Sequence, residues 1–556
     1  MVRKLRFGLI ILVVCFMFNT LAFAQSLPTL VDVNPSAKEG DWLIGATPYN
    51  YDPNKPVLVF VQGLDGSSKS WYGETMYTNK NDMYDYAYNA GYRTAFVELR
   101  DSDGNAGSMW RNGSTLSNQL KSICEYFGVS KVNLVCHSKG GVDSQTAIVH
   151  YGAYKYVDKV FTLSTPHWGS QLADLANSWY AGWLADIVGY KSDGTYVLQT
   201  SYMDYFRSIT DNRSENDSVK YYTCAGTNWG PTFSSLYFGG LYLSAYDSND
   251  GAVTVTSAKN PRGTHIFTKN LHHDNIRLGN KVWSFIQPYI GYHSSNISSV
   301  NYYMANSLSL DSQQYVAKND TILPTPIINA TQPEEQDDNI LLRGGDVINK
   351  ETVNVPVDSS VKEATFNLMV SDPSIEVTLV SPKGEEYKFR KSHKDSDFFK
   401  GATHMIANVK SPKSGEWKLN LKSNKKGAYF MITSFDSTTK SKVNMKDIKV
   451  RNGGKLDLVL DNKAMDKKLE KFETSVVVST SKAKERIRKV KEQKLSSNME
   501  VLEESVNMPE EAGLYNMSVT IKGNLEDGSP YERTVVKSIV VDSDSISVES
   551  LKKLTE

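Results

Sequence analysis

The sequence of 556 residues is poor in cysteine and has no excess of either charge. Cys15 lies in an apolar N-terminal run, which leaves Cys124, Cys136 and Cys224 for the rest of the chain. Three cysteines can form at most one disulfide, so a scaffold held together by several disulfides is excluded. Basic and acidic residues number 62 each, which leaves no positive surplus to attract a phosphate backbone. We therefore expect no nucleic-acid partner.

Long apolar runs are scarce as well, and the single example stands at the N-terminus. Basic side chains at positions 3, 4 and 6 precede an almost uninterrupted apolar stretch over 7–23. Ala22 and Ala24 are small residues at the two positions that a signal peptidase recognises. The pattern predicts a signal peptide over 1–24 and a secreted, extracellular protein. No later run is long enough to cross a bilayer as a helix.

The segment 25–300 alternates short apolar runs with amphipathic stretches such as 116–127. Strands that alternate with helices form mostly parallel sheets covered by helices on both faces. We therefore predict an α/β domain here. Its strands are expected at 57–61, 94–99, 132–135, 157–163 and 220–225.

The composition changes over 301–346, which holds three prolines and the acidic run 334–338 and is typical of a linker. Beyond it, apolar and polar residues alternate with a period of two in many short segments bounded by turns. This pattern is typical of antiparallel β-sandwiches. We predict two of them, Ig-like or jelly-roll-like, over 347–437 and 438–545, followed by a tail over 546–556.

Within the α/β domain, the segment 177–246 is crowded with aromatic residues. An exposed cluster of that size normally meets a ligand or an interface. Two interpretations stay open. The segment forms a lid or acyl-binding wall that includes Trp179 and Trp183, or it forms a plain helical layer of the core.

The stretch 132–144, VNLVCHSKGGVDS, combines a short apolar run with a helix start around Ser138. A serine on a sharp strand-to-helix turn exposes its hydroxyl next to free N–H groups at the helix N-terminus. Small residues are needed two positions before and after it, because the strand and helix backbones pass close together there. Gly140 meets this requirement, and Cys136 stands where glycine is usual.

A nucleophilic serine needs a base, and on this fold the histidine comes late in the chain. His265, His272 and His273 are the late candidates in the domain. His272 and His273 stand directly before Asp274, which is suited to cap a following helix. Because neighbouring side chains on an extended loop point in opposite directions, only one of the two can face Ser138. We favour His273 and keep His272 as the alternative.

The orienting acid should precede the histidine by one strand. The turn 248–253, SNDGAV, supplies Asp250, and Asp247 is the second choice. The oxyanion formed during acyl transfer needs N–H donors. The glycine-rich turn 62–66 can present the N–H of Leu64, opposite the N–H of Lys139 that follows the serine.

Together these motifs resemble the secreted bacterial lipases of the α/β-hydrolase superfamily. The matching pieces are QGLDG (62–66), CHSKGG (136–141), STPHWGS (164–170), NDGAV (249–253) and the late His-Asp pair. Gln62 and Cys136 depart from the family's His and Gly. The resemblance covers roughly residues 54–292 and leaves the C-terminal half unexplained.

The resemblance implies a serine carboxylic ester hydrolase of the triacylglycerol lipase type that acts on lipids without a cofactor. Some such lipases hold a structural calcium ion near the catalytic histidine, which makes Asp274 a candidate ligand. Related enzymes cleave polyhydroxyalkanoate polyesters, so a depolymerase is an alternative. Another is a non-catalytic surface-binding protein with a vestigial hydrolase domain. In each case the sandwiches are candidates for contact with a polymer or surface.

Overall fold

The structure is a computed structural model that describes twelve stretches of the chain. These are 30–31, 37–181, 192–291, 325–326, 339–394, 401–439, 442–445, 449–461, 465–480, 488–497, 501–542 and 547–555. The predicted signal peptide, Trp183 and most of the predicted linker lie outside them. Within these stretches, no helix is both long and apolar enough to span a membrane.

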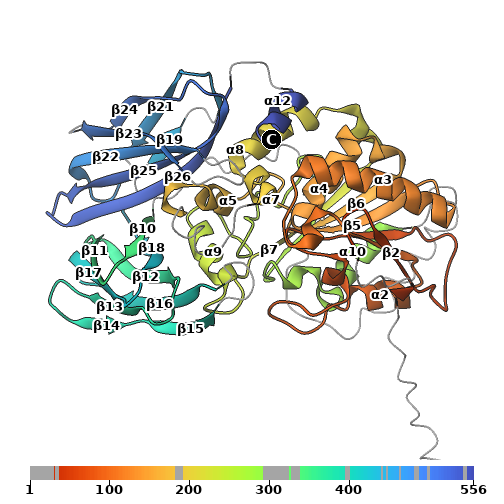
Figure 1. Ribbon diagram of the computed structural model, residues 1–556, viewed down its shortest axis with the longest axis horizontal. Coiled ribbons are helices and arrows are strands. Elements are labelled where there is room, and N and C mark those ends of the chain that lie inside the picture. The colour runs from red at the N-terminus through yellow and green to blue at the C-terminus, as the bar shows by residue number, and fades with distance from the viewer. Residues whose placement is uncertain are drawn as a thin grey trace, which may run out of the picture.

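A nine-stranded mixed sheet forms the first half of the molecule (Figure 1). The order across the sheet is β1-β2-β4-β3-β5-β6-β7-β8-β9. The six strands from β4 to β8 are parallel, and the pairs at both edges are antiparallel. This confirms the predicted α/β class. The strands are β1 (Leu30–Val31), β2 (Trp42–Gly45), β3 (Leu58–Val61), β4 (Thr94–Val97), β5 (Val132–His137), β6 (Val157–Leu163), β7 (Lys220–Gly226), β8 (Gly263–Lys269) and β9 (Thr325–Pro326).

Helices cover both faces of this sheet, because its central strands are apolar on both sides. Leu58 and Phe60 of β3 pack in one cluster with α2 (Met83–Asn89) and α10 (Gly279–Ile290). Val59 and Val61 pack in another with α3 (Met109–Phe127) and α4 (Lys139–His150). Short 3-10 helices lie in the connections: η1 (Ser68–Trp71), η2 (Arg100–Asp103), η3 (Ala153–Lys155), η4 (Trp179–Ala181), η5 (Ser214–Ser218) and η6 (Asn275–Arg277).

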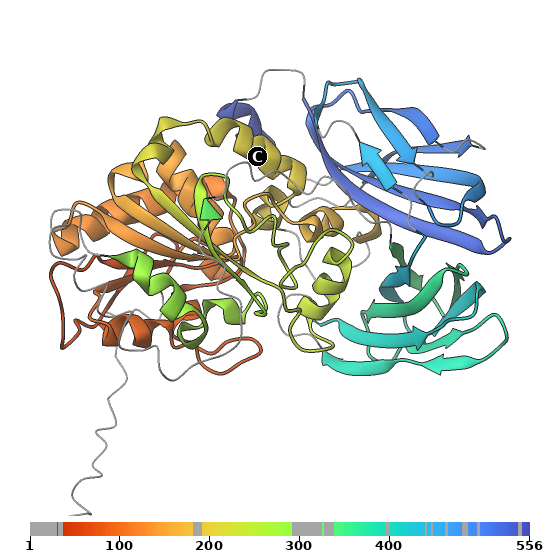
Figure 2. The same ribbon diagram turned by 180° about the vertical axis from the view of Figure 1, so that it is seen from behind.

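Four helices leave the sheet at the carboxyl ends of its strands and extend toward the second half of the molecule (Figures 1 and 2). Among the described residues, three lie between β6 and β7, and the fourth lies between β7 and β8. We call them the bridging helices. They are α5 (Gln171–Ala176), α7 (Asp193–Val197), α8 (Thr200–Thr210) and α9 (Ser235–Leu243).

Two mostly antiparallel β-sandwiches form the second half, with one parallel pair among the described strands, β20 with β26. The first pairs a sheet of order β10-β18-β12-β16-β15 with one of order β11-β17-β13-β14. Its first strand begins inside the predicted linker, because Gly344 and Gly345 pair with Phe430 and Tyr429 rather than forming a turn. The strands are β10 (Ile340–Val347), β11 (Lys350–Val357), β12 (Val361–Val370), β13 (Glu376–Val380), β14 (Glu386–Lys388), β15 (Arg390–Lys394), β16 (Thr403–Lys410), β17 (Gly415–Lys422) and β18 (Gly427–Ser437).

The second sandwich pairs sheets of order β19-β21-β24 and β20-β26-β25-β22-β23. The segment predicted as a tail contains α12 (Val548–Lys553), where Leu551 accepts a hydrogen bond from the Tyr202 hydroxyl of α8 at 3.0 Å. The strands are β19 (Lys442–Met445), β20 (Lys449–Val450), β21 (Lys455–Asp461), β22 (Leu469–Thr480), β23 (Arg488–Ser497), β24 (Val501–Asn507), β25 (Gly513–Leu525) and β26 (Pro530–Val541).

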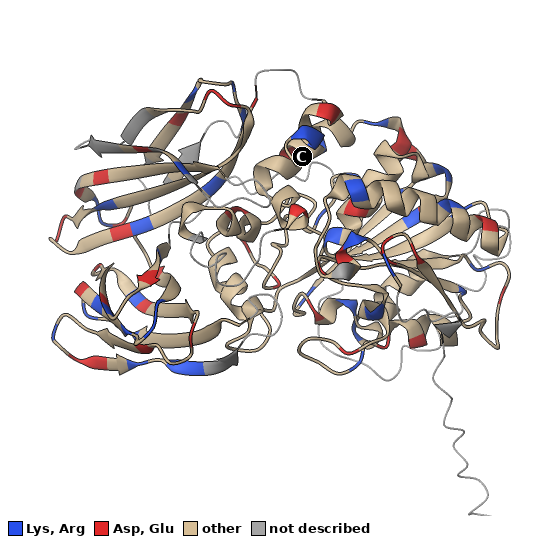
Figure 3. Cartoon of the chain, viewed as in Figure 1, with Lys and Arg blue, Asp and Glu red and all other residues tan. Residues whose placement is uncertain are grey.

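The bridging helices bury their apolar side chains against the sandwiches. One cluster joins α7 and α8 to α3, α4 and α5 as well as to the second sandwich and α12. Its members are Met109, Trp110, Val142, Ala173, Tyr196, Val197, Leu198, Tyr202, Met203, Tyr205, Phe206, Leu514, Val540 and Leu551. Another joins α9 mainly to the first sandwich: Phe238, Tyr242, Leu243, Ile340, Leu342, Met369, Phe430, Ile432 and Val536. The described aromatic residues of 177–246 thus lie mostly at an interface. Figure 3 shows α9 without charged residues at this junction.

A buried ion pair ties the two sandwiches to each other. Arg533 of β26 lies 2.6 Å from the Asp358 carboxylate in the turn after β11, and both side chains are fully buried. The guanidinium also lies 4.0 Å from the centre of the Phe435 ring. The sandwiches therefore meet the bridging helices as one unit.

Candidate active site

Ser138 stands on the sharp turn between β5 and α4, in a strained backbone conformation. Its φ of 51° and ψ of −131° lie outside the regions that L-residues favour. The close approach expected around it is present. A Cβ atom on Gly140 would lie 2.3 Å from the Gln62 carbonyl oxygen, and one on Gly63 would lie 2.9 Å from Ser138 Cβ. Glycine at both positions lets the end of β3 pass against this turn.

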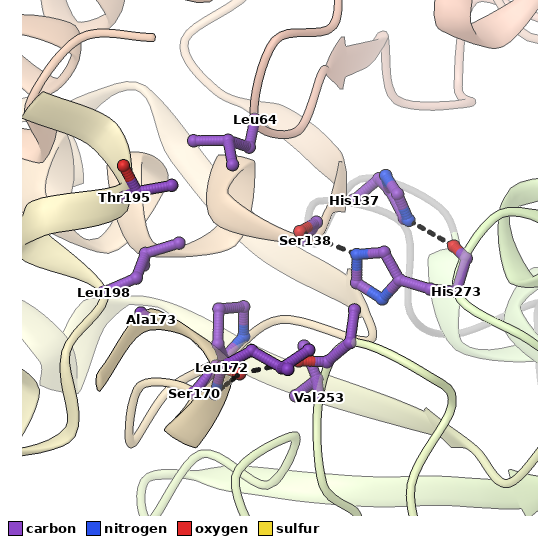
Figure 4. Close-up of a pocket in the computed structure, with 12 residues that line it drawn as sticks. Leu64, His137, Ser138, Ser170, Leu172, Ala173, Thr195, Leu198, Val253 and His273 are labelled. Carbon is purple, nitrogen blue, oxygen red and sulfur yellow. Dashed lines mark hydrogen bonds between the residues drawn. The ribbon is translucent and has the colours of Figure 1, made fainter. Parts of the chain in front are cut away.

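His273 lies between Ser138 and Asp250. Its Nε2 is 2.9 Å from Ser138 Oγ, and its Nδ1 is 2.8 Å from Asp250 Oδ2. Figure 4 shows the Ser138–His273 contact at the edge of the cavity. None of the three residues is more than 7% exposed. The serine, imidazole and carboxylate therefore form one buried hydrogen-bonded series.

The other candidates lie elsewhere. His272 packs edge-on against the Tyr77 ring, and its Nδ1 accepts the N–H of Asn275 at 3.3 Å. His265 bonds to two threonine hydroxyls on the sheet. Asp247 accepts the N–H and hydroxyl of Thr256. None of the three reaches Ser138 in the described part of the chain.

A turn fixes the carboxylate of Asp250. Its Oδ1 accepts the N–H groups of Ala252 at 3.0 Å and Val253 at 2.8 Å, which leaves Oδ2 for the imidazole. The Asp250 carbonyl accepts the N–H of His273 at 3.0 Å. This turn therefore sets both the direction of the acid and the position of the histidine.

The N–H groups proposed from sequence as oxyanion donors lie on either side of Ser138. Lys139 is the first residue of α4, and Leu64 lines the cavity. Neither main-chain N–H donates a hydrogen bond to any of the described residues. Gln62, where the family has histidine, joins the strand ends: its amide donates to the Val97 carbonyl at 2.9 Å and accepts the Leu99 N–H at 2.7 Å.

His137 is a site residue that the sequence did not single out, because the base on this fold comes late in the chain. Its Nε2 donates to the main-chain carbonyl of His273 at 2.7 Å, and the two ring centres are 4.8 Å apart. Burial, together with His273 and Arg277, lowers the pKa of His137 well below its usual value, so the ring is neutral at neutral pH. It therefore supports the loop that carries His273. Its place directly before the serine was the one sequence signal for this role.

A cavity of about 120 Å³ opens at Ser138, and its lining is mostly apolar (Figure 4). Residues of the sheet ends form one side, and residues of the bridging helices α5 and α7 and of the loop after α7 form the other. The lining residues are Leu64, His137, Ser138, Pro166, Ser170, Leu172, Ala173, Thr195, Leu198, Ala252, Val253 and His273.

The segment expected to be a lid or an acyl-binding wall therefore contributes only a small part of this lining, through Thr195 and Leu198. Trp179 instead lies at the second sandwich, with Lys489 5.1 Å from its ring centre. Trp183 is outside the described residues.

Asp274 neither caps a helix nor has the surroundings of a calcium ligand. Its side chain makes no cap hydrogen bond to the η6 turn that follows. Its Oδ2 accepts the N–H groups of Met76 and Tyr77 at 3.1 and 3.2 Å, and its Oδ1 pairs with Arg277. Both oxygens therefore hold the loop 76–77 and a guanidinium. Within the described ranges, no three acidic, histidine or cysteine side chains are grouped as metal ligands.

The motif STPHWGS connects β6 to α5 behind the site. His167 is buried. Its Nε2 lies 3.2 Å from Thr162 Oγ1, and its Nδ1 lies 3.2 Å from Asn260 Nδ2. Ser170 caps α5, because its hydroxyl accepts the Leu172 N–H, and the same hydroxyl donates to the Ala252 carbonyl at 2.7 Å. The motif therefore couples the start of a bridging helix to the turn that carries Asp250.

The sheet order and the strand–serine–helix turn define the class of this protein as an α/β hydrolase. The structure is similar to that of Bacillus licheniformis lipase BlEst2 in propeptide form, with a TM-score of 0.70 and 32% sequence identity. The match covers 91% of this chain and 98% of that one. The chain therefore belongs to the lipase family of the α/β-hydrolase superfamily that includes BlEst2, as the sequence motifs predicted.

Other similarities cover shorter parts. A triacylglycerol lipase from Burkholderia plantarii is 27% identical over 180 residues, which are 31% of this chain and 45% of that lipase. One from Pseudarthrobacter phenanthrenivorans is 30% identical over 130 residues, which are 22% of this chain and 37% of that lipase. The chain thus matches less than half the length of these curated relatives. A family model described as hemicentin galactose-binding domain-like matches residues 343–430, in the first sandwich.

Proposed function

We propose that this protein is a secreted serine hydrolase that cleaves carboxylic esters of lipids through Ser138, His273 and Asp250. One observation carries the proposal: the continuous hydrogen-bonded series from the strained serine through the imidazole to the carboxylate, at the mouth of an apolar cavity. Membership in the lipase family and the similarity to triacylglycerol lipases support the same chemistry.

In this mechanism His273 removes the proton from Ser138 as its Oγ attacks the ester carbonyl. Asp250 holds the imidazole by its Nδ1–H and stabilises the imidazolium that forms. The N–H groups of Leu64 and Lys139 donate to the tetrahedral oxyanion. The imidazolium then gives its proton to the departing alcohol. Water, activated by the same histidine, releases the acid from the acyl-enzyme.

The substrate class follows from the cavity. Leucine, valine, proline and alanine side chains line most of it, which suits an acyl chain better than a polar group. Lipid esters are therefore the first choice, and polyhydroxyalkanoate polyesters are the alternative. A vestigial, purely surface-binding role is less well supported, because the serine, histidine and acid are all in bonding geometry.

For the C-terminal half we propose a covering role in a precursor form. The relative that matches nearly the whole chain was solved in a propeptide form. In this chain, Leu514, Val540 and Leu551 pack in the same cluster as Ala173 and Leu198, which line the cavity. Contact with a polymer through the first sandwich is the second candidate, favoured by the galactose-binding-like match.

A fluorophosphonate probe tests the catalytic proposal, because it phosphonylates only an activated serine. We expect labelling of the wild-type chain at Ser138, and loss of both labelling and p-nitrophenyl ester hydrolysis in Ser138→Ala. Since the three residues act as a unit, the loss should reach about 10⁴-fold or more. A Ser138→Ala protein that keeps a tenth of the wild-type rate would disprove the assignment. For secretion, the N-terminus of protein recovered from the medium should be Gln25.

A further inference from the structure

Lys139 carries a fully buried ammonium group that the proposed mechanism does not use. Its Nζ lies 2.8 Å from Asp143 Oδ2 and 3.3 Å from Asp101 Oδ2. The Nδ2 of Asn112, on α3, donates to both carboxylates. All four residues are at most 1% exposed. We call Lys139, Asp101, Asp143 and Asn112 the lysine cluster.

Burying the charged groups of the lysine cluster costs free energy. Burial disfavours an ammonium, but the carboxylates of Asp101 and Asp143 outweigh it and raise the pKa of Lys139, so the side chain stays charged. An apolar side chain at position 139 would leave the main-chain N–H in place without the cost of burying these charges. The charge therefore calls for an explanation other than stability.

The cluster connects the two oxyanion donors. At one end, Lys139 is itself a donor through its main-chain N–H. At the other end, Asp101 lies in η2, and the loop after η2 reaches the turn that carries Leu64. There the N–H of Ala106 donates to Asp65 Oδ1 at 3.2 Å, directly after Leu64. Asp65 has a positive φ of 52°, so its main-chain direction needs such an anchor.

A second contact holds the same loop against Leu64. The carbonyl of Ala106 accepts the N–H of Gly194 at 3.0 Å. A Cβ atom on Gly194 would lie 2.7 Å from Leu64 Cδ1, so α7, the loop and the Leu64 side chain are in close contact. Both ends of the loop are therefore held, Asp101 in the lysine cluster and Ala106 against Leu64, although Gly104 and Asn105 between them are exposed.

We propose that the lysine cluster is a positioning device that fixes the separation of the Lys139 and Leu64 N–H groups. This inference rests on the proposed function, since it assumes that Ser138 is the nucleophile. Oxyanion donors act only if they are held ready at the place where charge develops, and small displacements are costly. Lys139, through its side chain, and Asp101 are positioning residues, and neither side chain needs to touch the substrate.

Asp101→Ala is the sharpest test, because it cuts the connection to the loop and leaves the Lys139–Asp143 pair intact. We expect kcat for a soluble p-nitrophenyl ester to fall at least about tenfold, with KM changed by less than about twofold. Affinity for an alkyl boronic acid, which forms a tetrahedral adduct on the serine, should fall by the same factor as kcat. Fluorophosphonate should still label Ser138, more slowly.

Three further variants separate positioning from folding. Asp527→Ala removes the partner of Lys467, 2.7 Å away at the sandwich surface, and should leave kcat unchanged. Lys139→Met combined with Asp143→Asn removes one cation and one of two carboxylates, so the net cluster charge stays the same. This double variant should lower kcat more than Asp101→Ala does. Lys139→Arg keeps the positive charge and should keep most of the wild-type kcat.

The outcomes are distinct. If Ser138→Ala is inactive while Asp101→Ala and the double variant keep kcat and boronic acid affinity within twofold, the lysine cluster is only structural and this inference is wrong. A lowered unfolding temperature with unchanged boronic acid affinity would likewise show that the cluster is only structural. An active Ser138→Ala would overturn the proposed function itself.

Discussion

The sheet and the bridging helices of this hydrolase domain are stabilised in different ways. Both clusters that cover the sheet consist of residues between 37 and 290, so the sheet is buried by its own domain. The bridging helices instead bury Tyr202, Phe206, Phe238 and Tyr242 in clusters that include side chains of the sandwiches or α12. One region packs within its own domain, and the other, the dependent region, packs in part on residues more than 90 positions later in the chain.

The candidate active site crosses this division. Ser138 lies directly after strand β5 of the sheet and His273 in the loop after β8, and Asp250 lies in the turn between α9 and β8. Thr195 and Leu198 bring the opposite wall of the cavity from the dependent region. The bonding chemistry and the shape of the cavity should therefore respond to different changes. Four predictions test this, from the largest expected effect to the smallest.

If the chemistry belongs to the sheet, the two neighbouring histidines should differ sharply. We expect His273→Ala to lower kcat by about 10⁴-fold, because the serine loses its base. His272→Ala removes a ring that packs on Tyr77 and should keep most of the rate. Steady-state kinetics on a soluble ester, with far-UV circular dichroism as a check on folding, measures both. Equal losses in the two variants would contradict the assignment of His273.

Removing the cover should affect the dependent region alone. From sequence, a chain that ends near residue 292 is expected to keep activity on soluble esters, since all the proposed chemistry precedes that point. Because α7, α8 and α9 share clusters with the sandwiches, we also expect hydrogen-exchange protection to vanish in these helices and to persist in β3 to β8. Under the covering role, hydrolysis of emulsified lipid should rise. Loss of protection throughout the sheet would show that the sheet, too, depends on the sandwiches.

A matched pair of core substitutions sharpens the comparison. Leu134→Ala empties a site in the sheet cluster, and Leu514→Ala empties one in the cluster shared with α8. Each should cost about 2–5 kcal/mol of local stability, because both side chains are fully or almost fully buried. Hydrogen exchange should show the loss in the strands for Leu134→Ala and in the bridging helices for Leu514→Ala. Loss of protection in the bridging helices for Leu134→Ala and in the strands for Leu514→Ala would contradict the separate stabilisation of the two regions.

The dependent region should also respond to pH through Asp174 of α5. Burial raises the pKa of this carboxyl to about 6, although the N–H and hydroxyl of Thr200 favour its charged form. A raised folded-state pKa stabilises the fold most below the unfolded value near 4, and the contribution is lost as pH rises through 6. The protection factors of α5 and α8, which correct for the intrinsic pH dependence of amide exchange, should therefore fall from pH 4 to pH 7. Asp174→Asn should flatten this profile, and an unchanged slope would exclude Asp174 as the cause.

Much of the hydrolase fold could be predicted because its signals are local. The continuous apolar runs at 132–135 and 157–163 are what strands buried on both faces require, and β5 and β6 lie there. The turn around Ser138 is predictable for the same reason. Two residues after the serine only a small side chain fits, and Gly140 stands there. Helix α3 begins seven residues before the predicted start, because the Ser108 hydroxyl accepts the Arg111 N–H and caps it there.

What the sequence could not predict depends on contacts between distant residues. Nothing near Lys139 indicates that Asp101 lies beside its ammonium, and nothing near His137 indicates the carbonyl of His273 136 residues later. The aromatic residues of 177–246 posed the same problem. Their number showed that something must cover them, but only the assembled structure identifies the sandwiches as the cover.

The hydrogen bond from the Tyr202 hydroxyl to the Leu551 carbonyl has a consequence for biosynthesis, because it joins residues 349 positions apart. A ribosome adds about 5–20 residues per second, so Leu551 is made roughly 17–70 s after Tyr202. During that interval the side of α8 that faces α12 lacks Leu551, although Met109, Trp110 and Val142 of the same cluster have already been made. Helix α12 thus covers a surface of α8 that the first half of the chain leaves exposed. Translation that stops before α12 leaves this surface exposed and prone to aggregation.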